Sequence, residues 1–216
     1  MTAFLGTHTQ WVPSSCPASR NNEVAQTIKG QGIIVDWGDN TEATRVGSDT
    51  RSDHIYTNPG EYTVKIYGQC DTITLASSDI TGVQDWGELN FTNFAFYKPA
   101  SSGDPVIQSL KLVSVPNWLP PTVTSLYYSF AYCRAFDDPN IDLWSVLNLV
   151  SINRAFGNSG ITDRLGPWFT PNLQDMNNAF SGTSFNGPIE NWYVGNVTNM
   201  TALFASNPAF NRNLTK

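Results

Sequence analysis

Residues 175–192 read DMNNAFSGTSFNGPIENW, and close variants of this stretch stand on both sides of it. Twenty-four residues earlier the chain reads SINRAFGNSGITDRLGPW, and twenty-four residues later it reads NMTALFASNPAFNRNLTK. A fixed period of this length is the signature of a repeat architecture, in which each unit is one small piece of structure. The repeat therefore decides the fold of the C-terminal part of the chain.

Four apolar columns run through the repeat, with their members spaced by 24 to 26 residues. The columns are Leu126, Ile152, Met176 and Met200; Phe130, Phe156, Phe180 and Phe204; Phe136, Ile161, Phe185 and Phe210; and Trp144, Trp168 and Trp192. One unit is too short to bury such side chains alone, but stacked units place like residues over like and form a continuous core. We therefore predict a solenoid over residues 73–216, degenerate and capping in 73–124 and regular in 125–216.

The side chains that we expect in the core of this solenoid are aromatic or methionine. They are Phe130, Trp144, Phe156, Trp168, Met176, Phe180, Phe185, Trp192, Met200 and Phe204. Trp118 stands 26 residues before Trp144, which indicates that the tryptophan column begins there in a degenerate form. Terminal units of a repeat array are commonly atypical because they cap the stack.

The amino-acid composition of the chain restricts the classes of function that we expect for it. Of the 216 residues only 14% are charged, the net charge is −6 and the pI is about 4.7. An ordinary soluble domain has about 25% charged residues, so Asn, Ser, Thr and Gly must cover much of this surface. Such surfaces suit β-rich proteins that work outside cells or on particles. Nucleic-acid binding needs clustered Lys and Arg, and the 12 basic residues here are scattered, so we expect no nucleic-acid partner.

The N-terminal part carries a different signature, DWGDN at residues 36–40 and HIYTNPGEYTVKIYG at residues 54–68. Runs of β-branched and aromatic residues at 33–35 and 62–67, separated by turn-forming residues, predict strands. The two segments resemble the PKD domain, an immunoglobulin-like β-sandwich with the pattern WGDG and then H-x-Y-x-x-x-G-x-Y-x-V. Asn40 replaces the last Gly of WGDG, which a turn absorbs because Asn tolerates the left-handed conformation. The resemblance implies a PKD-like β-sandwich over residues 1–72.

Asp36, Asp39 and His54 are the residues of this region that could carry chemistry. The two carboxylates stand three residues apart, but acid–base chemistry needs a cleft that a turn in a sandwich seldom offers. We expect their oxygens to accept hydrogen bonds from turn amides, and His54 to be a structural residue between sheet and loop. The only other histidine is His8. Because no motif supports a Ser-His-Asp arrangement and HExxH is absent, we predict no catalytic residue and no enzyme.

The three cysteines, Cys16, Cys70 and Cys133, form an odd set without a Cys-x-x-Cys spacing. They imply neither a zinc site nor a full disulfide framework. A Cys16–Cys70 bridge and three buried or unreactive thiols are the two alternatives. We predict no metal and no cofactor.

The repeat resembles that of BspA-like leucine-rich repeat surface proteins, which are bacterial or phage-encoded. Their units carry the phrases W-x-V-x-x-V-T-x-M and M-F-x-x-A-x-x-F-N, and here the first phrase is matched by Trp192, Val194, Val197, Thr198 and Met200. The resemblance covers roughly residues 85–216, and Gly166-Pro167 and Thr170-Pro171 break the pattern in the middle unit. Proteins of this kind often place a PKD-like segment ahead of the repeats, as here.

The resemblance implies a mainly β, non-enzymatic protein of structural or attachment function, exposed at a surface. We expect a virion component, a phage capsid decoration or tail-associated host-binding protein, with protein or glycan partners. The alternatives are a bacterial cell-surface adhesin and the targeting modules of a longer secreted hydrolase. The candidate binding residues are Asn177, Asn178, Asn196 and Asn199; the alternative is that these residues form turns and cap carbonyls between coils.

The sequence as given carries no signal for the general secretory pathway and no run of the ~20 apolar residues that a membrane span needs. We therefore expect a virion-surface or extracellular protein without a membrane span. The unit that begins at Asn199 contains a one-residue insertion and reaches Lys216 before its tryptophan. An open coil exposes aromatic side chains, so we expect either further chain or a contact with another subunit at this end.

Overall fold

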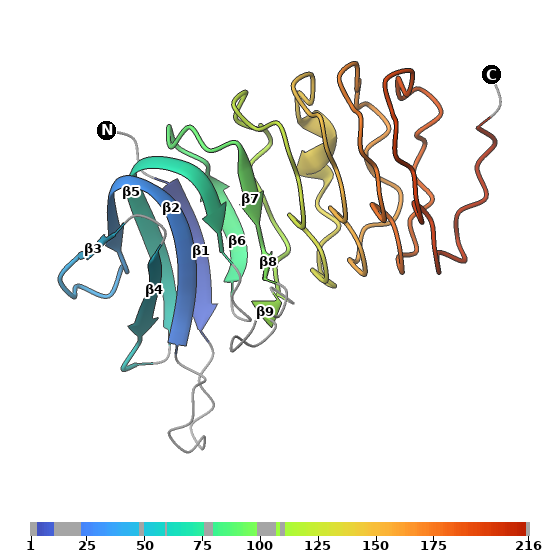
Figure 1. Ribbon diagram of the computed structural model, residues 1–216. Helices are drawn as coiled ribbons and strands as arrows, with labels where there is room; N and C mark the ends of the chain where they lie inside the picture. The colour runs from blue at the N-terminus through green and yellow to red at the C-terminus, as the bar shows by residue number, and fades with distance from the viewer. Residues whose placement is uncertain are drawn as a thin grey trace.

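The computed structural model describes residues 4–10, 23–47, 50–58, 60–75, 80–98, 107–108 and 111–214. A twisted β-sheet forms the N-terminal end, and a row of stacked chain turns leads from it to the C-terminus (Figure 1). The predicted mainly β class is confirmed, and the one helical element in these ranges is a short 3-10 helix. The elements are β1 (Phe4–Gln10), β2 (Glu23–Asp36), β3 (Thr44–Val46), β4 (Thr50–Ile55), β5 (Gly60–Thr74), β6 (Ile80–Asp85), β7 (Asn93–Ala95), β8 (Tyr97–Lys98), β9 (Ile107–Gln108) and η1 (Pro139–Leu143).

Seven of these strands pair into one sheet, ordered β3-β2-β5-β1-β6, with β4 also on β2 and β7 also on β5. All pairs are antiparallel except β5–β7, which is parallel. The sequence predicted a sandwich of two facing sheets, but within the described ranges these strands form a single continuous sheet. β2 and β5 are long, with 14 and 15 residues, and each pairs with several other strands along its length. The two strands therefore join all of these partners into one sheet. A separate pair, β8–β9, follows β7.

The DWGDN segment forms a tight turn after β2, as predicted. Asp36 Oδ1 accepts a hydrogen bond from the amide of Gly38 at 2.9 Å, and Asp39 Oδ1 accepts bonds from the amide and hydroxyl of Thr41. Asn40 has a φ of 65°, the left-handed conformation expected for it. Both carboxylates are therefore used to hold the turn.

His54 ties this turn to the sheet. Its Nε2 lies 2.7 Å from Asp39 Oδ2, and its ring stacks on Trp37 with centroids 4.8 Å apart. Tyr56 packs edge-on against His54, and its hydroxyl donates to the Trp37 carbonyl at 2.9 Å. The predicted structural role of His54 is confirmed, since the imidazole is enclosed by a carboxylate and two aromatic rings.

One parallel ladder runs from β5 through the rest of the chain. After the β5–β7 pairing, isolated bridges join one turn to the next, and backbone N–H groups donate to carbonyls of the following turn, as from Phe156 to Ala179 at 3.0 Å. The predicted period of 24 residues is the length of one turn of this ladder. We call residues 111–214 the stack. The bridged positions are Asn93, Ser125, Ser151, Asp175 and Asn199.

The phenylalanine column lies inside the stack. The rings of Phe130, Phe156 and Phe180 are nearly parallel, at 2° and 5°, with centroids 5.5 and 5.6 Å apart. Phe204 continues the column at 5.7 Å from Phe180. Offset aromatic pairs at such distances contribute about 0.5–1.5 kcal/mol each beyond the burial of their area.

The tryptophan column runs beside it. Trp144, Trp168 and Trp192 have centroids 6.4 and 5.6 Å apart. Each indole N–H donates to a backbone carbonyl of the preceding turn, for example from Trp168 to Ile141 at 2.8 Å. The rings are therefore buried without leaving an indole donor unpaired, which matters because an unsatisfied buried donor costs about 1–3 kcal/mol.

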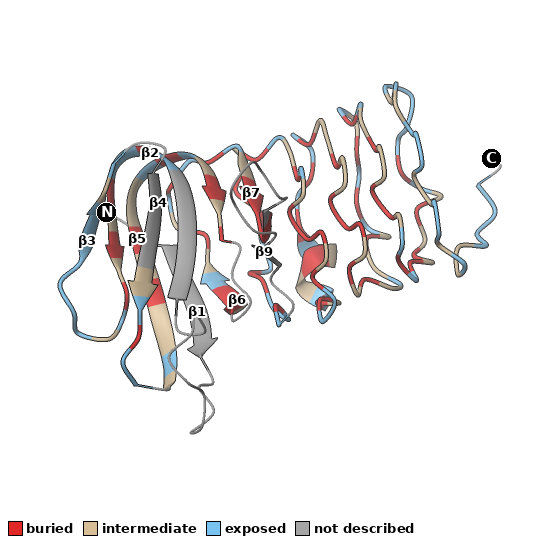
Figure 2. Ribbon diagram, turned by 60° about the horizontal axis from the view of Figure 1, so that its bottom comes forward, coloured by how far each residue is buried: buried red, intermediate tan, exposed pale blue. Residues whose placement is uncertain are grey.

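Met200 departs from the prediction for the core. It is 44% exposed and Phe204 only partly buried, because in the described residues no further turn stacks on the one that holds them. Burial decreases in this last turn (Figure 2). The other eight residues predicted for the core are at most 6% exposed: Phe130, Trp144, Phe156, Trp168, Met176, Phe180, Phe185 and Trp192.

Trp118 also departs from the predicted column, since it is 39% exposed, while its neighbour Leu119 is buried. Its backbone carbonyl accepts a hydrogen bond from Trp86 Nε1 at 2.9 Å. The ring of Trp86 is fully buried and packs against Trp144 with centroids 6.2 Å apart. Trp86, from the segment after β6, thus fills the end of the tryptophan column.

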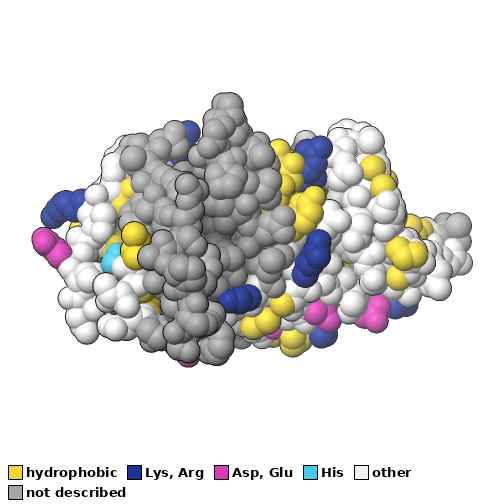
Figure 3. Space-filling model, turned by 90° about the horizontal axis from the view of Figure 1, so that it is seen from below, with side chains coloured by type: hydrophobic (Ala, Val, Ile, Leu, Met, Phe, Trp, Pro, Cys, Tyr) yellow, Lys and Arg dark blue, Asp and Glu magenta, His cyan; other side chains and the backbone are white. Residues whose placement is uncertain are grey.

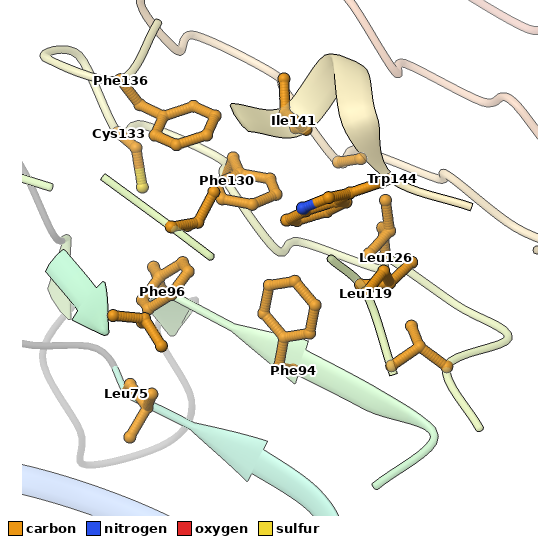
Figure 4. Packing of buried hydrophobic residues seen from close by; sticks show 14 of the residues in the cluster. Leu75, Phe94, Phe96, Leu119, Leu126, Phe130, Cys133, Phe136, Ile141 and Trp144 are labelled. Atoms are coloured by element: carbon orange, nitrogen blue, oxygen red, sulfur yellow. The ribbon is translucent and has the colours of Figure 1, made fainter. Parts of the chain in front are cut away.

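The sheet and the stack share one core. A single cluster of buried apolar side chains extends from Ile33 in β2 to Trp192 in the stack. Figure 4 shows the join, where Phe94 of β7 lies between Leu75 and the rings of the first turns, 5.7 Å from Phe130. The domain boundary predicted between residues 72 and 73 falls inside β5. The sheet therefore covers the first turn of the stack.

We expect Phe156→Ala to lower the free energy of unfolding by about 3–5 kcal/mol, the usual cost of truncating a buried phenylalanine. Phe169→Ala is the matched control, because Phe169 is 56% exposed in the same turn and surface substitutions usually change stability by less than about 0.5 kcal/mol. Urea unfolding followed by tryptophan fluorescence measures both. Equal losses would contradict the stacked core.

The Asp39 turn predicts a pH dependence. Burial raises the pKa of Asp39, but hydrogen bonds from Thr41 and His54 outweigh it, so the pKa lies below its ordinary value of 3.8. Because the folded pKa is depressed, the carboxylate stabilises the fold fully above pH ~4, and this contribution is lost as the pH falls through the folded value. Thermal unfolding between pH ~6 and ~2 should therefore show a steeper loss of stability in the wild type than in Asp39→Asn. Glu42→Gln, at an exposed carboxylate of the same loop, should keep the wild-type slope.

Candidate functional site

Two of the four predicted binding residues, Asn196 and Asn199, make hydrogen bonds to the backbone of the stack. Asn196 donates from Nδ2 to the carbonyl of Pro171 at 2.8 Å, and Asn172 does the same one turn earlier to Leu147. Asn199 accepts a hydrogen bond from the amide of Thr201 at 3.1 Å. These side chains cap carbonyls and form turns, which is the alternative that the sequence left open.

The other two predicted residues, Asn177 and Asn178, are hydrogen-bonded to each other at 2.6 Å. Asn178 also lines a groove on the stack, with a volume of about 180 Å³, which we call the stack groove. Its residues are Tyr97, Tyr128, Ala131, Tyr132, Arg154, Gly157, Asn158, Asn178 and Ser181. Of the four predicted asparagines, only Asn178 thus lies at a described groove.

The aromatic rings of the stack groove are largely engaged with each other. Tyr97 stacks on Tyr132 with centroids 4.8 Å apart, and the Arg154 guanidinium lies 5.5 Å from the centre of the Tyr128 ring. Burial raises the pKa of Tyr97 and of Tyr128 above the ordinary value of 10.0. These hydroxyls stay protonated at neutral pH. The groove is a small cluster whose rings and guanidinium already contact one another.

A larger groove lies where the sheet meets the stack, and we call it the junction groove. Its volume is about 920 Å³, inside the range of roughly 300–1,000 Å³ that is usual for ligand pockets. It is lined by residues of β2 and β5, of the segment between β6 and β7, and of the stretch 118–122. The lining residues are Gln31, Gly32, Gly68, Gln69, Gly87, Glu88, Asn90, Trp118, Pro120, Pro121 and Thr122.

The sequence did not predict the junction groove. Trp118 was the signal that could have indicated it, because it is a tryptophan at an imperfect repeat spacing. The glutamines of Gly30-Gln31-Gly32 and Gly68-Gln69 gave a second signal, since both stand next to glycine inside strand-like runs. Their meeting depends on strand register, which neither segment shows alone.

No site for a metal emerges from the side chains that the structure describes. Among them no three His, Cys, Asp or Glu residues are grouped so that they could hold a metal ion. Asp36, Asp39 and His54 are used in the turn after β2. His8 lies in a strand whose side chains are not described.

Cys70 and Cys133 are free and buried thiols. Burial raises the pKa of Cys70 to about 12, with the Asp71 carboxylate adding to the effect, and burial also raises the pKa of Cys133. A thiol that stays protonated is a poor nucleophile. Cys16 lies outside the described residues, and the free Cys70 gives no support to a Cys16–Cys70 bridge.

The surface of the stack is poor in charge. In Figure 3, uncharged side chains and backbone cover most of the described stack, and basic and acidic side chains are scattered. Such a surface favours recognition by hydrogen bonds and aromatic contacts over electrostatic attraction. No helix in the described ranges is long and apolar enough to cross a bilayer.

Comparison with known proteins identifies a family and no individual relative. No curated protein and no solved structure matches the chain. A family model described as "Mycoplasma protein of unknown function, DUF285" matches residues 106–216, which is more than half of the chain and includes the whole stack. That family is related to leucine-rich-repeat-like surface proteins. The chain therefore belongs to the DUF285 family.

Proposed function

We propose that the chain is a non-enzymatic attachment protein, displayed at a surface, whose stacked turns form a leucine-rich-repeat-type solenoid. The observation that carries the proposal is how the polar side chains of the stack are used. Asn148, Asn172 and Asn196 each donate to a carbonyl of the preceding turn at 2.8 Å. These polar groups of the stack therefore serve the fold, and other polar groups line the stack groove and the junction groove.

The leucine-rich-repeat assignment rests on the period and on the ladder. Bridges at Ser125, Ser151, Asp175 and Asn199 are parallel and follow the 24- to 26-residue unit. Solenoids of this type stack short units so that each contacts only its neighbours, and present an extended face of repeated side chains. For the N-terminal part, the proposal keeps the PKD-like assignment of the DWGDN turn and its aromatic cluster, within one continuous sheet.

The non-enzymatic assignment rests on the partners of the reactive groups. The two carboxylates of the DWGDN turn, Asp36 and Asp39, are held by turn amides, and Asp39 also by His54. The described thiols are buried and have raised pKa values. General acid–base or nucleophilic catalysis needs such groups free and facing a cleft, and the two grooves are lined mainly by aromatic, amide and small residues.

The surface that carries the protein is the finer part of the proposal. The family description names Mycoplasma, a genus of cellular organisms. This favours a cell-surface protein over the virion component expected from the sequence. Either location fits an uncharged scaffold with protein or glycan partners. A virion component therefore stays as the second form of the same proposal.

Immunogold electron microscopy with an antibody against the stack tests this proposal. We expect gold on the outer face of unpermeabilised cells that carry the gene, and an antibody against a cytosolic protein should label only after permeabilisation. Gold on particles in a regular shell or at a tail would support the virion form. Gold confined to the cytosol would contradict attachment in both forms.

A further inference from the structure

We propose that the junction groove binds a neutral saccharide, with a sugar ring stacked on Trp118 and its hydroxyls hydrogen-bonded by Gln31, Gln69 and Asn90. The inference rests on the proposed attachment function, because it gives the ligand class through which attachment would occur. It is carried by three features of the groove: an indole outside the core, a pair of amides held by bulged backbone, and amide and carboxylate side chains with no hydrogen-bond partner among the described residues.

Trp118 differs from the other tryptophans of the repeat. Trp144, Trp168 and Trp192 are buried, stacked and hydrogen-bonded through their indole nitrogens. The ring of Trp118 stacks on no described aromatic side chain, and Trp118 is 39% exposed and lines the groove. Its contribution to the fold is made by its carbonyl, which accepts from Trp86. The indole is thus free to offer an apolar face to a ligand.

Gln31 and Gln69 are direct cross-strand partners in β2 and β5. Side chains of opposed residues stand side by side on one face, with Cβ atoms about 4.5–5.5 Å apart. The register of β2 against β5 shifts on both sides of Gln31, between Lys29 and Gly30 and between Gln31 and Ile34. Such bulges redirect side chains and are frequent beside functional sites.

Glycines hold this amide pair in place. A Cβ at Gly30 would lie 2.0 Å from the carbonyl oxygen of Gln69, so only glycine permits the close approach of the two strands. Gly68 has a φ of 121°, a conformation that other residues rarely adopt. The backbone therefore fixes where the two glutamine side chains start, which reduces the entropy lost when they bind a ligand.

Thr122 donates to the carbonyl of Phe91 at 2.9 Å, but the other polar side chains of the groove have no hydrogen-bond partner among the described residues. This holds for Gln31, Gln69, Glu88 and Asn90, in contrast to the asparagines that tie the turns of the stack together. An amide side chain both donates and accepts hydrogen bonds, and a carboxylate accepts two. These groups therefore match the paired hydroxyls of a sugar. Three amides and a carboxylate around one exposed indole therefore form a set suited to a saccharide.

The charge of the groove selects the class of saccharide. None of the eleven lining residues is Lys or Arg, and Glu88 adds a negative charge. An acidic sugar would meet repulsion without a compensating cation. A peptide strand is also disfavoured beside β2 and β5, since Gln31 and Gln69 pair with each other and leave no open strand edge between them. A neutral saccharide is the ligand that these groups fit best.

The test is isothermal titration calorimetry of the full chain against neutral oligosaccharides of glucose, mannose, galactose and N-acetylglucosamine. We expect at least one of them to bind, and both Trp118→Ala and the double variant Gln31→Leu/Gln69→Leu to weaken binding about tenfold or more, the loss expected when one or two hydrogen bonds or a stacking contact are removed. Phe169→Ala is the matched control, because it removes an exposed aromatic ring that does not line the groove. Trp118→Ala retains the carbonyl that Trp86 needs, and unchanged circular dichroism would show that the variants fold.

Three results would overturn the inference. They are no binding of any neutral oligosaccharide in the panel, binding that Trp118→Ala leaves unchanged, and preferential binding of acidic saccharides or of a proline-rich peptide run in parallel. The result of this binding test is independent of the result of the immunogold test of the proposed function. Surface gold without saccharide binding would remove only this inference, and saccharide binding by a cytosolic protein would remove only the attachment function.

Discussion

The rest of the structure depends on the constant register of one parallel ladder, from β5 through β7 to Asn199. With a fixed turn length, each phenylalanine meets its equivalent in the next turn at about the same offset, and the rings of Phe130, Phe156 and Phe180 are nearly parallel. A turn of changed length must absorb the difference outside the ladder. The unit before Phe156 is two residues longer than those that follow, and η1 lies in it between Phe136 and Trp144.

The same register explains why the N-terminal sheet and the stack are not independent. β5 belongs to the antiparallel sheet through β1 and β2, and its last residues pair in parallel with β7. The first turn of the stack therefore has a partner for its backbone and, through Leu75 and Phe94, for its apolar side chains. At the other end of the described chain, no following turn covers Met200, which is 44% exposed. A repeat array needs such a cover because each unit buries its core only against a neighbour.

Features that repeat along the chain could be predicted from the sequence, whereas several features that occur only once could not. The buried columns of Phe156 and Trp168 could be predicted because the same residue type recurs at a constant spacing. Trp118 could not be placed correctly, because Trp86, which does not stand at the repeat spacing, fills its position in the column. The joining of the strands into one sheet, and the meeting of Gln31 with Gln69, depend on register between distant segments. Local pattern carries no information on that register.

The low charge of the chain also restricts how the protein can bind a partner. With few ions on its surface, the protein depends on amides and hydroxyls both to join its turns and to meet a ligand. Asn148, Asn172 and Asn196 show the first use, since each amide is taken up by a carbonyl of the neighbouring turn. An amide that belongs to no such ladder, as at Gln31 or Gln69, is therefore informative in this fold. Where several of these gather around an exposed indole, as in the junction groove, we propose that they bind a ligand.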